Sequence, residues 1–257
     1  MDEPFDLRVV PLARIVPHEE SEPRRVAKIV GRLASDTVLA NPPLVADVDD
    51  RLVLLDGANR VAALRMLDYR YAIVQVVPPA KLRLEMWHHA LLDTTPERLR
   101  AALATAPEVT LRPAPDEGLC MVLLADGGSS AAAPEPGAHP FEALNALVGS
   151  YLDRAVVRRT TDPRLAAHPD AAAVVAFPQL SLADVFGAVR AEERLLPAGI
   201  TRFVLTGRVL LLNAALDPLR SDRPVDELND WLAGLVAGRR AEGRIRHYPE
   251  AVYVLDD

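Results

Sequence analysis

The sequence has few of the residues that build disulfides, metal clusters or membrane spans. It contains a single cysteine, Cys120, among 257 residues, which excludes an internal disulfide and any cysteine-rich zinc site. No apolar run approaches the roughly 18–20 residues that a membrane-spanning helix needs, and the chain does not open with a signal-peptide pattern. We therefore expect a soluble, cytoplasmic protein.

The chain also lacks an excess of positive charge. Its formal net charge is −7, from 29 Lys and Arg against 36 Asp and Glu. Since nucleic-acid-binding surfaces depend on clustered basic residues, this balance argues against nucleic acid as a partner. Hydrophobic content of 50% and charged content of 25% are those of an ordinary globular protein. The length allows one large domain or two smaller ones.

One stretch carries the strongest functional pattern, Leu54 to Leu64. An apolar strand-like run, Arg51–Leu55, precedes it, and apolar residues at helical spacing follow. The segment between them, Asp56-Gly57-Ala58-Asn59-Arg60, is predicted to turn the chain from strand to helix. Free amides at a helix start attract anions, and an arginine adds a planar donor fork for phosphate or carboxylate. The alternative is a plain turn with a capping aspartate and a solvated arginine.

A second polar segment, Pro17 to Pro23, joins the first strands to the first helix. It holds His18, Glu19, Glu20 and a third carboxylate, Glu22. Acidic residues at a helix start can simply complement the helix dipole, which accounts well for Glu22. This explanation covers His18 and Glu19 less well, because both lie before the helix proper.

The remaining chain alternates helix-like and strand-like segments, which predicts a mixed α/β (α+β) fold. Predicted helices start at residue 24 and after the turn at 56–60, and follow at Leu82–Leu92, Thr94–Ala104, Pro140–Leu152, Leu182–Glu192 and Val225–Arg239. Predicted strands are Leu7–Val16 (interrupted at Pro11), Leu44–Val48, Arg51–Leu55, Ala72–Val77, Val109–Leu111, Cys120–Leu124, Ala155–Arg159, Ala172–Phe177, Ile245–Tyr248 and Ala251–Leu255, with a further strand carrying Thr201 and Arg202 toward the apolar run Val209–Leu212.

Two domains are predicted, residues 1–92 and residues 93–257. The small, polar, Pro- and Gly-broken stretch 126–139 is interpreted as an exposed loop or linker, or a long loop inside the second domain. The predicted helix at 82–92 carries Trp87, His88 and His89. Adjacent histidines on a helix point in different directions, so they are a poor metal pair.

Three blocks, taken together, resemble a known family. They are Val16-Pro17-His18-Glu19-Glu20 with the following Arg24-Arg25-Val26, then Asn41-Pro42-Pro43-Leu44-Val45, then Leu55 to Leu64. Their order and spacing resemble the ParB/sulfiredoxin fold, in the branch of the free serine kinases and a related siderophore-cluster serine kinase and regulator. The resemblance covers roughly residues 7–90. It implies a ParB/sulfiredoxin-like N-terminal unit packed with a second α/β C-terminal region.

The resemblance also implies roles for individual residues. Glu19 matches the family's base on the serine hydroxyl, with Glu20 as its neighbouring alternative. Asp56, Gly57, Ala58, Asn59 and Arg60 match the family's segment for nucleotide phosphates and metal, with Asp56 as the catalytic and metal-binding carboxylate. On the substrate side, the implied contacts are His18, Trp87, Thr201 and Arg202.

The chief departure from the family lies within the turn. The family's Asp-Gly-His-His-Arg segment has Ala58 and Asn59 here in place of both histidines. Asparagine can still donate and accept hydrogen bonds, whereas alanine can do neither. This change bears directly on nucleotide affinity and on phosphoryl transfer.

The resemblance implies a small-molecule kinase that uses ATP or ADP with Mg²⁺ to phosphorylate free serine or a similar hydroxyl metabolite. The alternative is a nucleotide-responsive, ParB-like binding or transcriptional regulatory protein without turnover. Against that alternative, no basic helix-turn-helix segment is evident. Sulfiredoxin chemistry needs a reactive cysteine beside the phosphate loop, and Cys120 lies in an apolar run far along the chain from Asp56.

Overall fold

The structure is a computed structural model that describes residues 5–113, 118–191 and 195–248, and its elements confirm the predicted mixed α/β class. The α-helices are α1 (Pro23–Ser35), α2 (Ala58–Met66), α3 (Pro96–Leu103), α4 (Pro140–Leu152), α5 (Leu182–Ala191) and α6 (Val225–Ala241). Short 3₁₀ turns are η1 (Leu12–Arg14), η2 (Pro79–Lys81), η3 (Leu165–Ala167) and η4 (Asp217–Arg220).

The strands fall into two main sheets and two short pairs. They are β1 (Asp6–Pro11), β2 (Ile15–Pro17), β3 (Val38–Leu39), β4 (Leu44–Val48), β5 (Arg51–Asp56), β6 (Tyr71–Val76), β7 (Arg83–Met86), β8 (His88–Leu92), β9 (Val109–Pro113), β10 (Cys120–Leu124), β11 (Ser129–Pro134), β12 (Val156–Thr160), β13 (Ala173–Ala176), β14 (Thr201–Val204) and β15 (Ala214–Ala215).

The described chain divides into two compact units. The first contains residues 5–17, 21–83 and 204–248, and the second contains residues 18–20 and 84–203. This division differs from the predicted boundary at residue 92, because the chain returns to the first unit after β14. Leu212, Leu219 and Leu228 are buried in the same core as Val9 and Leu64, which explains why the last segment belongs there.

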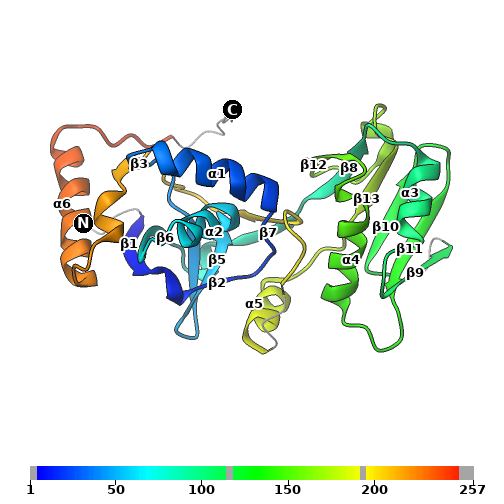
Figure 1. Cartoon of the computed structure of the whole chain (residues 1–257), viewed down its shortest axis with the longest axis horizontal. Helices are drawn as coiled ribbons and strands as arrows, with labels where there is room; N and C mark the ends of the chain where they lie inside the picture. The colour runs from blue at the N-terminus through cyan, green and yellow to red at the C-terminus, as the bar shows by residue number, and fades with distance from the viewer. Residues whose placement is uncertain (1–4, 114–117, 192–194, 249–257) are drawn as a thin grey trace. The chain divides into compact units, whose positions relative to one another are not determined.

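The first unit is built on a five-stranded mixed sheet in the order β1-β6-β4-β5-β2. β4 pairs antiparallel with β5 and parallel with β6, so the buried centre of the sheet is formed by residues 44–56 and 71–76. Helices α1 and α2 lie side by side, and α6 lies along β1 (Figure 1). The apolar strand Arg51–Leu55, predicted from its composition, is confirmed as the body of β5.

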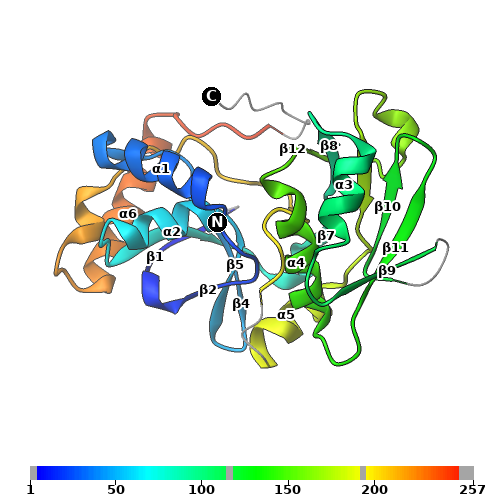
Figure 2. The same cartoon turned by 45° about the vertical axis from the view of Figure 1, so that its right-hand side comes forward.

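The second unit is built on a six-stranded antiparallel sheet in the order β12-β8-β13-β10-β11-β9. Helices α3 and α4 pack against each other, and α4 packs on β9 and β11 (Figure 2). The stretch 126–139 was predicted to be a loop or linker, but β11 runs through it and pairs with both β10 and β9. Its three alanines, Ala131 to Ala133, are buried, so this strand lacks the bulky side chains that usually mark one.

The predicted helix Leu82–Leu92 is wrong. The segment forms β7 and β8, separated at Trp87. β8 lies between β12 and β13, and residues His89 to Leu91 are all buried. A strand covered on both faces loses the polar–apolar alternation, so its short apolar run cannot be told from a helix by periodicity.

Ile245–Tyr248 was predicted as a strand, but it has no regular secondary structure, and neither has the apolar run Val209–Leu212. Prediction of a strand at Ala251–Leu255 falls outside the described residues. Within the described part of the chain, no helix has the length and apolar character needed to cross a membrane.

Candidate functional site

Backbone hydrogen bonds join residues 18–20 to Leu196, and all of these residues belong to the second unit. Leu196 N–H donates to the His18 carbonyl at 2.9 Å, and Glu20 N–H donates to the Leu196 carbonyl at 2.8 Å. Glu19 and Leu196 thereby form an isolated parallel bridge. These bonds fix the backbone on both sides of Glu19, so a short polar segment without its own helix or strand has a defined conformation.

The Glu19 carboxylate is held by two donors through one oxygen. Gly199 N–H and Thr201 Oγ1–H each donate to Glu19 Oε2 at 3.1 Å. The Glu19 side chain is 16% exposed, so it is partly desolvated while remaining in reach of solvent. The neighbouring Glu20 is exposed, and no contact of its carboxylate is found among the described residues. The structure therefore distinguishes the two glutamates that the sequence left as alternatives.

Gly199 has a backbone conformation that favours glycine. Its φ is +74°, and a Cβ built there would lie 2.0 Å from Arg159 Nη2. A hydrogen bond of 3.4 Å joins its carbonyl to His89 Nε2, and His89 Nδ1 lies 2.8 Å from the Tyr151 hydroxyl. Burial lowers the pKa of His89 to about 4, so this ring is neutral near pH 7. The neutral ring donates to Gly199 through Nε2–H and accepts from Tyr151 at Nδ1.

His18 and Thr201 were predicted as substrate contacts. The structure buries His18 to 2% exposure and places its Nε2 2.8 Å from Thr201 Oγ1. The ring also packs edge-on against Phe203, with centroids 5.2 Å apart. Because successive residues of a strand face opposite sides, Thr201 and Phe203 share one side of β14, and Arg202 takes the other.

Arg202 and Trp87, the other two predicted substrate contacts, lie together. The Arg202 guanidinium stands 5.0 Å over the Trp87 ring and forms an ion pair with Glu85. Arg202 and Glu85 also line a cavity of about 530 Å³ with His88, Thr161 and Gln179. Met86 and Phe177 complete the lining, so the wall is mixed, with both charge signs among its polar groups, which suits a small polar ligand.

The predicted strand-to-helix turn is confirmed in the first unit. Asp56 is the last residue of β5, Gly57 is the N-cap of α2 with φ +98°, and α2 begins at Ala58. A Cβ on Gly57 would lie 3.1 Å from Pro43 Cβ, so this position needs glycine for both conformation and space. Gly57, the N-cap of α2, has no side chain and so supplies no side-chain acceptor to the first amides of the helix.

Two arginines flank Asp56 at this turn. Arg208 forms an ion pair with the Asp56 carboxylate, and Arg60 Nη2 lies 3.8 Å from the same carboxylate. Arg60 Nη1 donates to the Asn41 carbonyl at 2.7 Å, which orients its guanidinium. The turn thus combines one carboxylate with two guanidiniums, an arrangement with a positive excess next to a helix start.

Ala58 and Asn59, at the start of α2, both have structural contacts. Asn59 Oδ1 accepts the Glu22 N–H at 2.8 Å, and Glu22 is the N-cap of α1. Ala58 is partly buried and packs against the core of the first unit. Asn59 therefore joins the start of α2 to the start of α1.

The described residues contain neither a cluster of metal-ligating side chains nor a reactive thiolate. Among these residues, no group of three or more His, Cys, Asp or Glu is placed to hold a metal ion. A metal at Asp56 would have a single protein carboxylate, which suits only an ion carried mainly by ligand phosphates. Cys120 is buried, and burial raises its thiol pKa to about 12, so it is no reactive thiolate.

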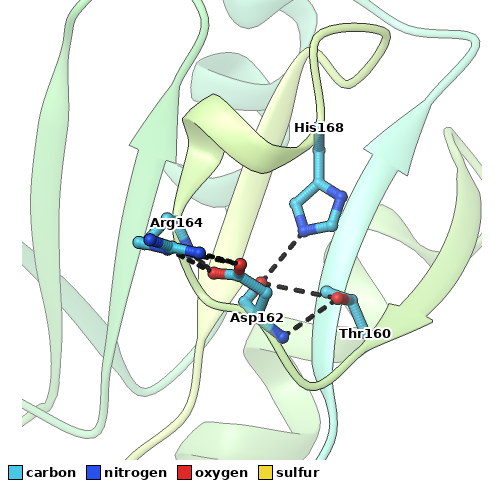
Figure 3. Close-up of polar contacts among 4 residues, drawn as sticks. All are labelled: Thr160, Asp162, Arg164 and His168. Atoms are coloured by element: carbon cyan, nitrogen blue, oxygen red, sulfur yellow. Dashed lines mark hydrogen bonds and ion pairs between the residues drawn. The ribbon is translucent and has the colours of Figure 1, made fainter.

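A cluster of polar and charged residues in the second unit stabilises the loop that contains it. The Asp162 carboxylate accepts hydrogen bonds from the Arg164 backbone N–H and guanidinium, and the Asp162 carbonyl lies 3.0 Å from His168 Nε2 (Figure 3). Thr160 Oγ1 accepts the Asp162 N–H at 3.1 Å. Hydrogen bonding from Arg164 holds the pKa of the Asp162 carboxyl well below its usual range. These bonds close the loop between β12 and η3, which explains the cluster without a ligand.

Three contributors to these sites were not predicted. Gly199 follows a proline and an alanine in the sequence, and this turn-like pattern was the one available signal. Arg208 pairs with Asp56 from 152 residues away, and no local pattern marks it. His89 was noted only as a poor metal ligand, and its contact with Gly199 depends on the sheet pairing that the helix prediction missed.

The fold is one that solved serine kinases share. A free serine kinase in complex with AMP superimposes with a TM-score of 0.71 and 16% identity, covering 84% of this chain and 95% of that chain. A Glu-to-Gln variant of a free serine kinase with AMP gives a TM-score of 0.74 at 15% identity, covering 84% and 95%. These likenesses establish the common fold.

A particular relative spans nearly the whole sequence. The ATP-dependent L-serine kinase SbnI of Staphylococcus aureus is 26% identical in an alignment 256 positions long, which covers 97% of this chain and 97% of that chain. The structure of a C-terminally truncated SbnI has a TM-score of 0.72 at 24% identity, covering 91% of this chain and 97% of that chain. No protein-family model matches the sequence.

Proposed function

We propose that this protein is a small-molecule kinase that transfers a phosphoryl group from ATP or ADP to free serine or a similar hydroxyl metabolite. The observation behind the proposal is the Glu19 carboxylate, held by Gly199 N–H and Thr201 Oγ1 in a chain that aligns over 97% of its length with an ATP-dependent L-serine kinase. The three matching sequence blocks support a ParB/sulfiredoxin-like fold for residues 7–90. We infer that the protein works in the cytoplasm.

The proposed reaction is a direct displacement at the terminal phosphorus. The serine hydroxyl oxygen attacks that phosphorus, a new O–P bond forms, and the bond to the bridging oxygen of the nucleotide breaks. ADP leaves when ATP is the donor, and AMP leaves when ADP is the donor. Glu19 accepts the hydroxyl proton, which is the role of a general base.

The turn at residues 56–60 is proposed to bind the nucleotide phosphates. The first amides of α2 and the guanidiniums of Arg60 and Arg208 can neutralise phosphate charge, and Gly57 allows close approach of the backbone. Mg²⁺ would be coordinated by phosphate oxygens with Asp56 as the protein carboxylate, and it would supply charge neutralisation on the transferred group. The single carboxylate at this turn fits an ion carried by the nucleotide.

Recognition of the substrate is assigned to the second unit. Arg202 is held by Glu85 and by the Trp87 ring, which presents a fixed guanidinium suited to a carboxylate such as that of an amino acid. The mixed charge of the cavity that Arg202 lines also suits a zwitterion. Free serine carries the carboxylate, the ammonium and the hydroxyl that these groups require.

A regulatory protein that binds nucleotide without turnover is the second candidate. The observation that favours it concerns the two positions where the serine kinases that this sequence resembles have histidines. Here Ala58 packs against the core, and the side-chain oxygen of Asn59 accepts a hydrogen bond from the Glu22 N–H. In that case the turn would bind nucleotide, and no phosphoryl group would be transferred to a hydroxyl.

The test is product formation by the purified protein. Wild type is incubated with serine and ATP, or ADP, with and without Mg²⁺, and phosphoserine is measured by mass spectrometry. The kinase proposal predicts phosphoserine with one donor at least, together with an equal amount of ADP or AMP. Nucleotide binding without phosphoserine from any donor would contradict the kinase and favour the regulatory protein.

A further inference from the structure

We propose that His18 and Thr201 are positioning residues that orient the Glu19 carboxylate, and that Thr201 does not bind the substrate. The inference rests on the proposed kinase function and assigns to Thr201 a role different from the one its family resemblance implies. It begins from the hydrogen bonds of a single hydroxyl group, Thr201 Oγ1, which contacts both side chains.

The donors and acceptors at this hydroxyl can be assigned in one way. An ionised carboxylate only accepts, so Thr201 gives its one hydroxyl hydrogen to Glu19 Oε2. His18 Nε2, 2.8 Å from the same oxygen, must then carry a hydrogen and donate it to Thr201. The result is a directed chain, from His18 through Thr201 to Glu19, in which each hydrogen has one acceptor.

Direct contact between His18 and Glu19 is not an alternative to this chain. His18 Nε2 and Glu19 Oε2 are 3.8 Å apart, which is beyond hydrogen-bond distance. The imidazole therefore acts on the carboxylate through the threonine. Burial of His18 to 2% exposure and its edge contact with Phe203 keep the ring in one orientation, and they also keep it away from a ligand in solvent.

The two bonds to Glu19 converge on one of its oxygens. Gly199 N–H and Thr201 Oγ1 both donate to Oε2, and no hydrogen bond of Oε1 is found among the described residues. Anchoring one oxygen restricts the rotation of the carboxylate and leaves the other oxygen available to accept a proton from the serine hydroxyl. A positioned base of this kind contributes through orientation, and small displacements of it are costly.

Steady-state kinetics of Thr201→Val separate positioning from substrate binding. The variant keeps the branched shape and lacks the hydroxyl. We expect kcat for phosphoserine formation to fall by about 10²-fold, with KM for serine and for nucleotide close to wild type. Thr201→Ser restores the hydroxyl and is expected to recover most of the turnover. The matched control, Thr105→Val, removes the hydroxyl that donates to the Ala102 carbonyl at 2.8 Å, and it should leave both constants unchanged.

His18 is tested by a double-mutant cycle with Thr201→Val. His18→Phe keeps a ring against Phe203 and lacks the donor, whereas His18→Gln keeps an N–H at a similar reach. We expect His18→Phe to lower kcat, His18→Gln to lower it less, and the double variant His18→Phe/Thr201→Val to be no slower than Thr201→Val alone. Residues that act through one shared group show such non-additivity.

Several outcomes would overturn the inference. A rise in KM for serine with kcat retained in Thr201→Val would make Thr201 a substrate contact, and additive losses in the cycle would give His18 a separate role. If His18→Phe does not fold, the kinetics of Thr201→Val, Thr201→Ser and His18→Gln decide whether the two residues position Glu19. Absence of phosphoserine from wild type is a different result, because it refutes the kinase proposal itself and the inference with it.

Discussion

Stability of the second unit should fall in mild acid because of one buried residue, His89. Its pKa is lowered from 6.5 to about 4, chiefly by burial, and its ring is bonded to Tyr151 and Gly199. The unfolded chain therefore binds a proton between these two pH values that the folded chain does not. The stabilisation is complete above pH 6.5 and is lost as the pH falls toward 4. Integrated from about pH 7.5 to about pH 5, the loss is about 2 kcal/mol.

The prediction is tested by urea unfolding of wild type and His89→Gln at a series of pH values. Glutamine keeps an N–H that can reach the Gly199 carbonyl, and it does not titrate. The difference in free energy of unfolding between wild type and variant should shrink by about 2 kcal/mol between about pH 7.5 and about pH 5. A difference that stays constant with pH would refute the assignment of a neutral, buried His89.

Three further predictions concern the turn at residues 56–60. Arg60→Ala should weaken nucleotide binding by about 1.5–3 kcal/mol in titration calorimetry, since a charge-assisted hydrogen bond is lost, and unchanged affinity would remove the phosphate-site interpretation. Asn59→Ala should lower the free energy of unfolding by about 1–3 kcal/mol, because the Glu22 N–H loses its acceptor; unchanged unfolding in urea would contradict it. Gly57→Ala should cost about 1–2 kcal/mol of unfolding free energy through its left-handed backbone, and equal stability by thermal melting would contradict a φ of +98°.

Local patterns were sufficient to predict much of the fold. The strand ending at Asp56, the glycine turn and helix α2 follow from an apolar run, a residue suited to positive φ and apolar residues at helical spacing. Helix α3 begins at Pro96 with Thr95 as its N-cap, as the Thr-Pro-Glu pattern predicts. Each of these signals lies within a few residues of the feature that it specifies.

Features that depend on distant pairing could not be predicted in this way. β8 is a central strand because β12 and β13 pair with its two edges, and β11 is a strand because two neighbours pair with its alanines. The candidate site shows the same limit. The sequence singled out Glu19 and Thr201, but their hydrogen bond joins positions 182 residues apart. Choosing Glu19 over Glu20 required the contact with Leu196 that orients the loop.

Glu19 is proposed as the base of a serine kinase, and the Glu19→Gln variant tests that role. The variant keeps the shape and a hydrogen-bonding oxygen for Gly199 and Thr201, and it removes the basicity. Phosphoserine formation should fall by about 10²–10⁴-fold, the usual contribution of a general base, while nucleotide affinity and melting temperature stay near wild type. Glu20→Gln is the matched control and should lose much less. Turnover of Glu19→Gln equal to that of wild type would contradict the account.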